Sequence, residues 1–178
     1  MNKKIYFLKN IPALLRGIFG KRKVKLPDGN YLIFSSTLSA VYIPKAGKAV
    51  DLGIISRRVV TNAGVDFMAS DFVDGTTDIT NFNWHASGTG TNPESVNDTA
   101  LQTEVESRVS GTKSKPSAGQ YRTVATITYG SSYAITEHGI FSASTGGTLW
   151  DRSVFSAINV SSGDSIQFTY TLTINAGG

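Results

Sequence analysis

Two histidines, His85 and His138, are the residues best suited to acid–base chemistry in this chain, which contains no cysteine. A catalytic triad needs a histidine within hydrogen-bond reach of a serine and a carboxylate. Serines are abundant, so a nearby serine is expected by chance, and the sequence has no G-x-S-x-G nucleophile motif. Glu137 and His138 are adjacent, and neighbours on a strand project to opposite faces. We therefore predict structural roles for both histidines, no catalytic residues and no enzymatic activity.

Phosphate and metal chemistry are also weakly indicated. Residues 87–91 contain G-x-G but neither the third glycine nor the lysine of phosphate-binding loops, so we interpret them as a turn. The acidic positions Asp66, Asp71, Asp74 and Asp78 do not follow the spacing of a calcium-binding EF-hand loop. The absence of cysteine excludes disulfides and thiolate metal sites. The sequence thus predicts neither a bound metal nor a cofactor.

Four aromatic residues raise one further binding hypothesis. Trp84, Tyr129, Tyr133 and Trp150 could stack on sugar rings, as in a carbohydrate-binding module. Burial in a hydrophobic core is the simpler account of such large side chains. Both interpretations stay open at this point.

The charge is distributed unevenly along the chain. Residues 1–58 carry 12 Lys or Arg against two Asp, whereas residues 59–178 carry five Lys or Arg against 11 Asp or Glu. We therefore divide the chain into a basic N-terminal arm with a short helix and a hairpin (1–58) and a β-sandwich domain (59–178). A basic arm suits nucleic acid, an anionic membrane or an acidic protein surface. No nucleic-acid-binding fold is recognisable, which favours protein contact. The candidate contact residues are Lys3, Lys4, Lys9, Arg16, Lys21, Arg22, Lys23 and Lys25.

The arm contains an apolar stripe at helical spacing. Its members are Ile11, Leu14, Leu15, Ile18 and Phe19, with Gly20 as a helix-ending residue. The helix would dock on its own domain, reach a neighbouring subunit or lie on a membrane surface. The apolar run is too short to span a membrane. Lysine, arginine and proline interrupt it, which disfavours a signal peptide.

The remaining pattern predicts a mainly β protein. Turn residues 27–30 indicate a hairpin, and residues 60–73 are predicted as the helix of the β domain, with Thr61 or Asn62 as its cap. Apolar and polar residues alternate over 166–174, as in a half-buried strand. Further strands are predicted at 41–43, 79–86, 121–129, 134–142 and 148–160, and residues 103–108 form either a strand or an irregular segment. Together these segments favour an antiparallel β-sandwich or barrel.

Several segments resemble small virion structural proteins of tailed bacteriophages. The segments that carry the resemblance are 57–72, 85–105, 121–129, 134–144 and 146–173, and their most specific elements are 88–101, Thr136–Phe141, Asp151-Arg152 and Ser161–Asp164. The resemblance implies a capsid cement or decoration protein in the virion, assembled in the host cytoplasm. The alternative is a tail, neck or fibre-associated protein. Implied partners are the major capsid protein or other virion proteins and further copies of the chain, for which a trimer would suit capsid threefold positions.

Overall fold

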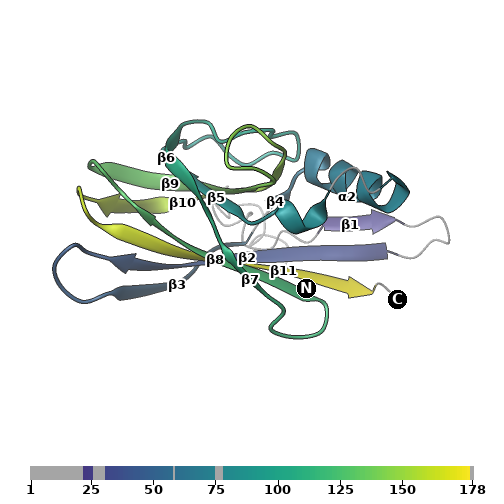
Figure 1. Cartoon of the computed structure of the whole chain (residues 1–178), viewed down its shortest axis with the longest axis horizontal. Helices are drawn as coiled ribbons and strands as arrows, with labels where there is room; N and C mark the ends of the chain where they lie inside the picture. The colour runs from purple at the N-terminus through teal and green to yellow at the C-terminus, as the bar shows by residue number, and fades with distance from the viewer. Residues whose placement is uncertain (1–21, 26–30, 58, 75–77, 177–178) are drawn as a thin grey trace, which may run out of the picture.

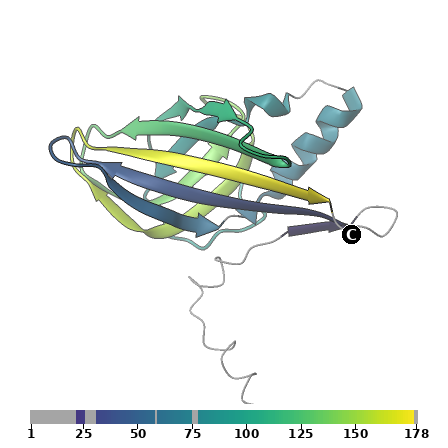
Figure 2. The same cartoon turned by 90° about the horizontal axis from the view of Figure 1, so that it is seen from below.

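The structure is a computed structural model that describes residues 22–25, 31–57, 59–74 and 78–176 (Figure 1). Two antiparallel sheets pack face to face, and one α-helix lies at one end of the sandwich (Figures 1 and 2). The predicted fold class, a mainly β antiparallel sandwich with one short helix, is confirmed.

The first sheet has six strands in the order β1-β2-β11-β8-β7, and β3 pairs with the same strand, β2, as β1 does. Figure 2 looks onto this sheet, with β11 (yellow) between β2 and β8. Its strands are β1 (Arg22–Lys25), β2 (Tyr31–Ile43), β3 (Val50–Arg57), β7 (Thr112–Ser114), β8 (Gln120–Thr128) and β11 (Ser165–Ala176).

The second sheet has five strands in the order β4-β10-β9-β5-β6. Its strands are β4 (Val59–Val60), β5 (Trp84–Gly88), β6 (Glu104–Ser110), β9 (Tyr133–Phe141) and β10 (Leu149–Val160). Strand β9 is central and is buried on both faces, because the connection between β5 and β6 covers the face that points away from the other sheet.

The core lies between the two sheets, and the alternation of β11 shows how the sequence builds it. Ile166, Phe168 and Tyr170 are fully buried, whereas Gln167 and Thr169 between them are partly exposed. Strands β2 and β8 flank β11 and contribute Leu38 and Ile127 to the same layer. Burial of the apolar side chains between the two sheets supplies most of the driving force for folding.

The helix α2 (Asn62–Asp74) agrees with the predicted helix at 60–73. Thr61 caps its first turn, because its hydroxyl oxygen accepts a hydrogen bond from the Gly64 amide at 3.0 Å. A Cβ atom added to Gly64 would lie 2.9 Å from the Trp150 ring, so glycine allows the helix to pack directly on that side chain.

The segment 79–86, predicted as one strand, is only partly a strand. Residues Ile79–Asn81 form a short 3-10 helix, η2, and β5 begins at Trp84. The cause is local: the Asp78 carboxylate accepts a hydrogen bond from the Thr80 amide at 2.8 Å, which closes a turn.

Strands β3 and β7 were not predicted, and the predicted short strand at 41–43 is the end of the long strand β2. Strand β3 pairs with β2 in an irregular register, with a φ of 63° at Gly53. The division at residue 58 does not separate two sheets, since β2 and β3 lie in the same sheet as β11.

Candidate functional site

A buried ion pair joins the two central strands of the second sheet. Glu137 lies on β9 and Arg152 on β10, and both side chains are fully buried. The Arg152 Nη2 and Nε atoms lie 2.8 and 2.9 Å from Glu137 Oε2. Removing two charges from water is expensive, so such a pair persists only when further hydrogen bonds satisfy its remaining atoms.

Glu137 supplies those bonds to the connection between β5 and β6. Its Oε1 accepts from the backbone amides of Gly90 at 3.0 Å and Thr103 at 2.7 Å. Its Oε2 accepts from the Gln102 amide at 3.0 Å. One carboxylate therefore holds both ends of this connection, residues 89–103, against the sheet.

Arg152 holds the middle of the same connection. Its Nη1 atom lies 2.9 Å from Asp98 Oδ2, and its guanidinium donates to the carbonyl oxygens of Asn92 at 3.3 Å and Pro93 at 3.5 Å. The planar guanidinium suits this role because it presents five donors in a fixed arrangement. The Glu137–Arg152 pair is thus the anchor of a long ordered loop.

The two glycines of the G-x-G sequence within 87–91 leave room for the Glu137 carboxylate. A Cβ atom on Gly88 would collide with the Thr103 carbonyl oxygen and lie 2.6 Å from Glu137 Oε1, and one on Gly90 would lie 2.5 Å from Glu137 Oε1. The two glycines allow the backbone to approach the carboxylate. Gly88 moreover belongs to β5, so the predicted turn begins later than expected.

The two histidines meet inside the core. His85 Nδ1 lies 3.0 Å from His138 Nε2, and His85 Nε2 lies 3.1 Å from the hydroxyl of Thr123. Thr123 is on β8, so this chain of polar groups crosses from one sheet to the other. Burial lowers the pKa of His85 to about 3, which keeps the ring neutral near pH 7. Glu137 and His138 point to opposite faces, as predicted, because His138 packs on the core ring of Phe168.

A second polar bridge between the sheets is centred on Asp151. Its Oδ2 accepts from the Ser36 hydroxyl at 2.8 Å and from the Tyr170 hydroxyl at 3.2 Å. The Trp150 indole donates to the Tyr170 oxygen at 2.8 Å. A register shift between Leu149 and Asp151 allows the consecutive residues Trp150 and Asp151 to contact the same tyrosine.

The turn before β11 is held by Asp164. Its carboxylate accepts from the backbone amides of Lys45 and Ser161 and from the Tyr42 hydroxyl, at 2.7 to 2.8 Å. The two amides and the hydroxyl hold the pKa of Asp164 below its usual value. This turn, like the ion pair, uses its polar residues to position backbone.

Of the four acidic positions considered for calcium, three belong to α2 and one lies at the start of η2. Asp66 and Asp71 lie on α2, and Asp78 caps η2. Among the described residues no group of three or more His, Asp or Glu could hold a metal ion. None of the described helices has the length and apolar character needed to cross a membrane.

Of the four aromatics considered for sugar stacking, Tyr129 and Trp150 are buried in the core. Tyr133 and Trp84 are partly buried and pack against the hydrophobic clusters. These four residues therefore do not form an exposed stacking surface.

The structure describes only part of the basic arm. The predicted hairpin is confirmed, because β1 pairs with β2 in antiparallel register from Arg22↔Phe34 to Lys25↔Tyr31. Arg22, Lys23 and Lys25 lie on β1. The other candidate contact residues, Lys3, Lys4, Lys9, Arg16 and Lys21, and the predicted helical stripe lie outside the described residues.

Sequence reasoning missed the Glu137–Arg152 anchor. Two signals were present: a Glu and an Arg within predicted strands, and a long polar segment between two other predicted strands. Comparisons with protein-family models, with curated proteins and with solved structures found no match. The fold and site define a β-sandwich in which buried ion pairs and hydrogen bonds position long loops.

Proposed function

We propose that this chain is a non-enzymatic structural protein of a tailed-phage particle, and that it acts as a cement or decoration protein of the head. The observation that carries the proposal is an open apolar edge on the first sheet. Among the described strands, β3 pairs only with β2. Within five residues it exposes Val50 by 48%, Leu52 by 37% and Ile54 by 53%.

Such an edge is unusual for a protein that remains alone in solution. An edge strand offers unpaired backbone donors and acceptors to another strand, and soluble monomers generally protect it with charge, bulges or covering segments. Residues 50–54 of β3 carry two of these features, the charge of Asp51 and the register shift at Gly53, and three of the five residues are exposed apolar side chains. Association through β3 would add main-chain hydrogen bonds and bury the three apolar side chains.

The use of the polar residues supports the non-enzymatic part of the proposal. Glu137, Arg152, Asp151 and both histidines are buried and engaged in positioning backbone or joining the sheets. A catalytic group must meet its substrate, whereas these groups stabilise a rigid body with ordered loops. Rigid bodies with ordered loops suit repeated weak contacts, which add up when many copies are held on one particle.

The self-association part is tested with a double substitution, Leu52→Lys together with Ile54→Lys. Wild-type protein is expected to form oligomers in sedimentation and light scattering, and the variant is expected to remain monomeric. Ser131→Lys with Ser132→Lys is the matched control, since both serines are exposed in the turn between β8 and β9. Monomeric wild-type protein at all accessible concentrations would contradict assembly through β3.

The position on the particle is tested by the copy number of the chain in purified virions, measured by quantitative mass spectrometry. A cement protein is expected at a copy number similar to that of the major capsid protein. A copy number far below that of the capsid subunits would replace the head assignment with a tail, neck or fibre position.

A further inference from the structure

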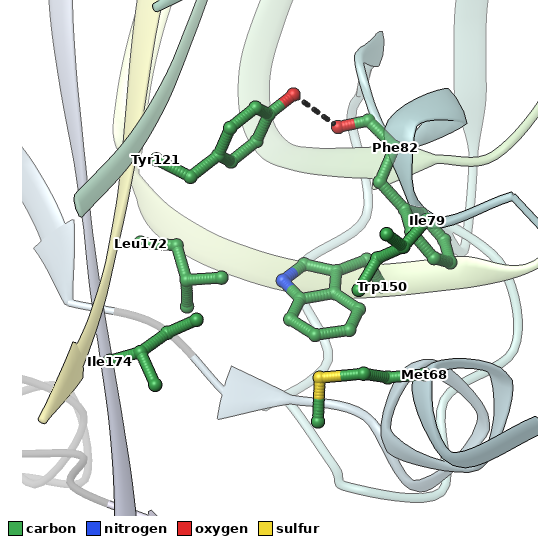
Figure 3. Close-up of a pocket in the computed structure, with 7 residues that line it drawn as sticks. All are labelled: Met68, Ile79, Phe82, Tyr121, Trp150, Leu172 and Ile174. Carbon is green, nitrogen blue, oxygen red and sulfur yellow. Dashed lines mark hydrogen bonds between the residues drawn. The ribbon is translucent and has the colours of Figure 1, made fainter. Parts of the chain in front are cut away.

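An apolar pocket opens at the end of the sandwich where β11 ends and α2 covers the core (Figure 3). Its volume is about 190 Å³. Two lining residues, Ile79 and Ile174, are each 37% exposed, so the pocket is accessible from outside. Most of the lining side chains come from α2, η2, β8, β10 and β11. The lining residues are Met68, Ile79, Phe82, Tyr121, Trp150, Leu172 and Ile174.

The polar atoms of the pocket walls already have partners. The Tyr121 hydroxyl donates to the carbonyl oxygen of Phe82 at 2.8 Å, the interaction drawn in Figure 3. The Trp150 indole donates to the Tyr170 hydroxyl at 2.8 Å. An occupant would therefore gain little from polar groups, and the pocket selects for an apolar side chain.

The N-terminal arm is tethered beside this pocket. Arg22, the first residue of β1, is paired with Phe34, and Phe34 is paired on its other side with Ile174 at the pocket rim. Two strand spacings separate Arg22 from Ile174, roughly 10 Å. Phe19 precedes Arg22 by three residues, and three residues also span roughly 10 Å when extended. The apolar stripe that ends at Phe19 is thus within reach of the pocket of its own chain.

Size and charge fit the same occupant. A cavity of roughly 150 Å³ lined by aliphatic and aromatic side chains binds benzene, so this larger pocket has room for a phenylalanine ring. Helix α2, which forms one wall through Met68, contains three aspartates and no Lys or Arg, whereas residues 1–25 contain eight Lys or Arg and no acid. Opposite charges on the two segments favour the approach of the arm to this end of the sandwich.

We propose that the apolar stripe of residues 11–19 docks on its own chain at this pocket, with the ring of Phe19 inserted between Met68, Trp150 and Ile174. Docking covers the exposed apolar rim and leaves the arm's basic side chains available at the surface. The inference does not depend on the proposed function, because it concerns contacts within one chain. It selects the first of the three placements of the stripe that the sequence left open.

The test measures the distance between two spin labels in the full chain. The chain has no cysteine, so Arg16→Cys, on the polar side of the stripe, and Asn175→Cys, exposed near the end of β11, take the labels without competition. Pulsed electron resonance is expected to give one short, narrow distance distribution. Phe19→Ser is expected to broaden and lengthen it, whereas Phe7→Ser, the same change outside the stripe, is expected to leave it unchanged.

Two further measurements keep the outcomes distinct. Ile174→Ser, labelled at the same two positions, changes the pocket instead of the arm and is expected to broaden the distribution as Phe19→Ser does. Dilution of labelled protein with excess unlabelled protein is expected to leave the narrow distribution intact. A broad distribution in the otherwise unsubstituted chain would overturn the docking. A narrow distribution that disappears on dilution would also overturn it, since the arm would then occupy a second copy.

Discussion

Glu137→Gln provides the sharpest test of the anchor that holds residues 89–103. The two carboxylate oxygens accept from three backbone amides and from Arg152. A glutamine side chain has one oxygen and one NH₂ group, so two of these four donors lose their acceptor in either orientation. An unsatisfied buried donor costs roughly 1–3 kcal/mol, and breaking a buried ion pair costs roughly 3–5 kcal/mol. We therefore expect the free energy of unfolding to fall by about 3–5 kcal/mol.

The measurement is urea denaturation followed by tryptophan fluorescence. Glu104→Gln is the matched control, because Glu104 forms an ion pair with Arg108 at 2.7 Å but has 30% of its side chain exposed. Partly exposed pairs contribute little, so the control is expected to lose less than about 1 kcal/mol. Equal losses in the two variants would refute the reasoning, since burial and the three amide bonds would then carry no additional stability.

The remaining predictions concern single groups of the core and the loop. Burial lowers the pKa of His85, so the unfolded chain binds more protons than the folded chain once the pH drops below about 6.5. The free energy of unfolding should therefore decrease by up to about 1.4 kcal/mol per pH unit as the pH is lowered from about 6 to about 5. The variant His85→Gln should show a smaller slope, and identical slopes in the two proteins would contradict the burial argument. The buried hydroxyl of Ser153 has no hydrogen-bond partner among the described residues, so Ser153→Ala should raise the free energy of unfolding by about 1 kcal/mol, measured by thermal unfolding. Ser36→Ala, which removes a hydrogen bond to Asp151, should lower it. A lower stability of Ser153→Ala would contradict the prediction. Gly88→Ala places a Cβ atom against a backbone carbonyl, so it should lower the free energy of unfolding by about 1–3 kcal/mol and accelerate amide hydrogen exchange in residues 89–103. Gly130→Ala is the control, because its Cβ atom would make only ordinary contacts. Equal exchange rates in the two variants would contradict tight packing at Gly88.

These predictions share one physical idea. The sandwich buries several polar and charged side chains, and they lie where segments distant in the sequence meet. Glu137 and Arg152 fix a loop, Asp151 and His85 join the two sheets, and Asp164 fixes a turn. A buried polar network that is fully satisfied specifies one arrangement, because any shift leaves a donor or acceptor unpaired. The loops are thereby ordered without a metal-binding group or disulfide among the described residues.

The sequence by itself determined the features that depend on local periodicity. The alternation at 166–174 predicted the final strand, and the structure places these residues in β11 with one face buried. The spacing of apolar residues and a cap at Thr61 or Asn62 predicted the helix within two residues at its start, and the structure places the cap at Thr61. Opposite faces for Glu137 and His138 followed from adjacency on a strand.

Only the tertiary structure decided which distant residues meet. Arg152 contacts Asp98, 54 positions away, and His85 contacts Thr123 across the core. Such pairs depend on strand order and register, which local periodicity does not specify: a polar residue on a strand shows the same local pattern whether it faces solvent or a buried partner. The edge strand β3 and the pocket beside β11 also exist only once the sheets have assembled. Local spacing therefore predicted the elements, and the long-range pairing of the strands decided which polar groups anchor the loops.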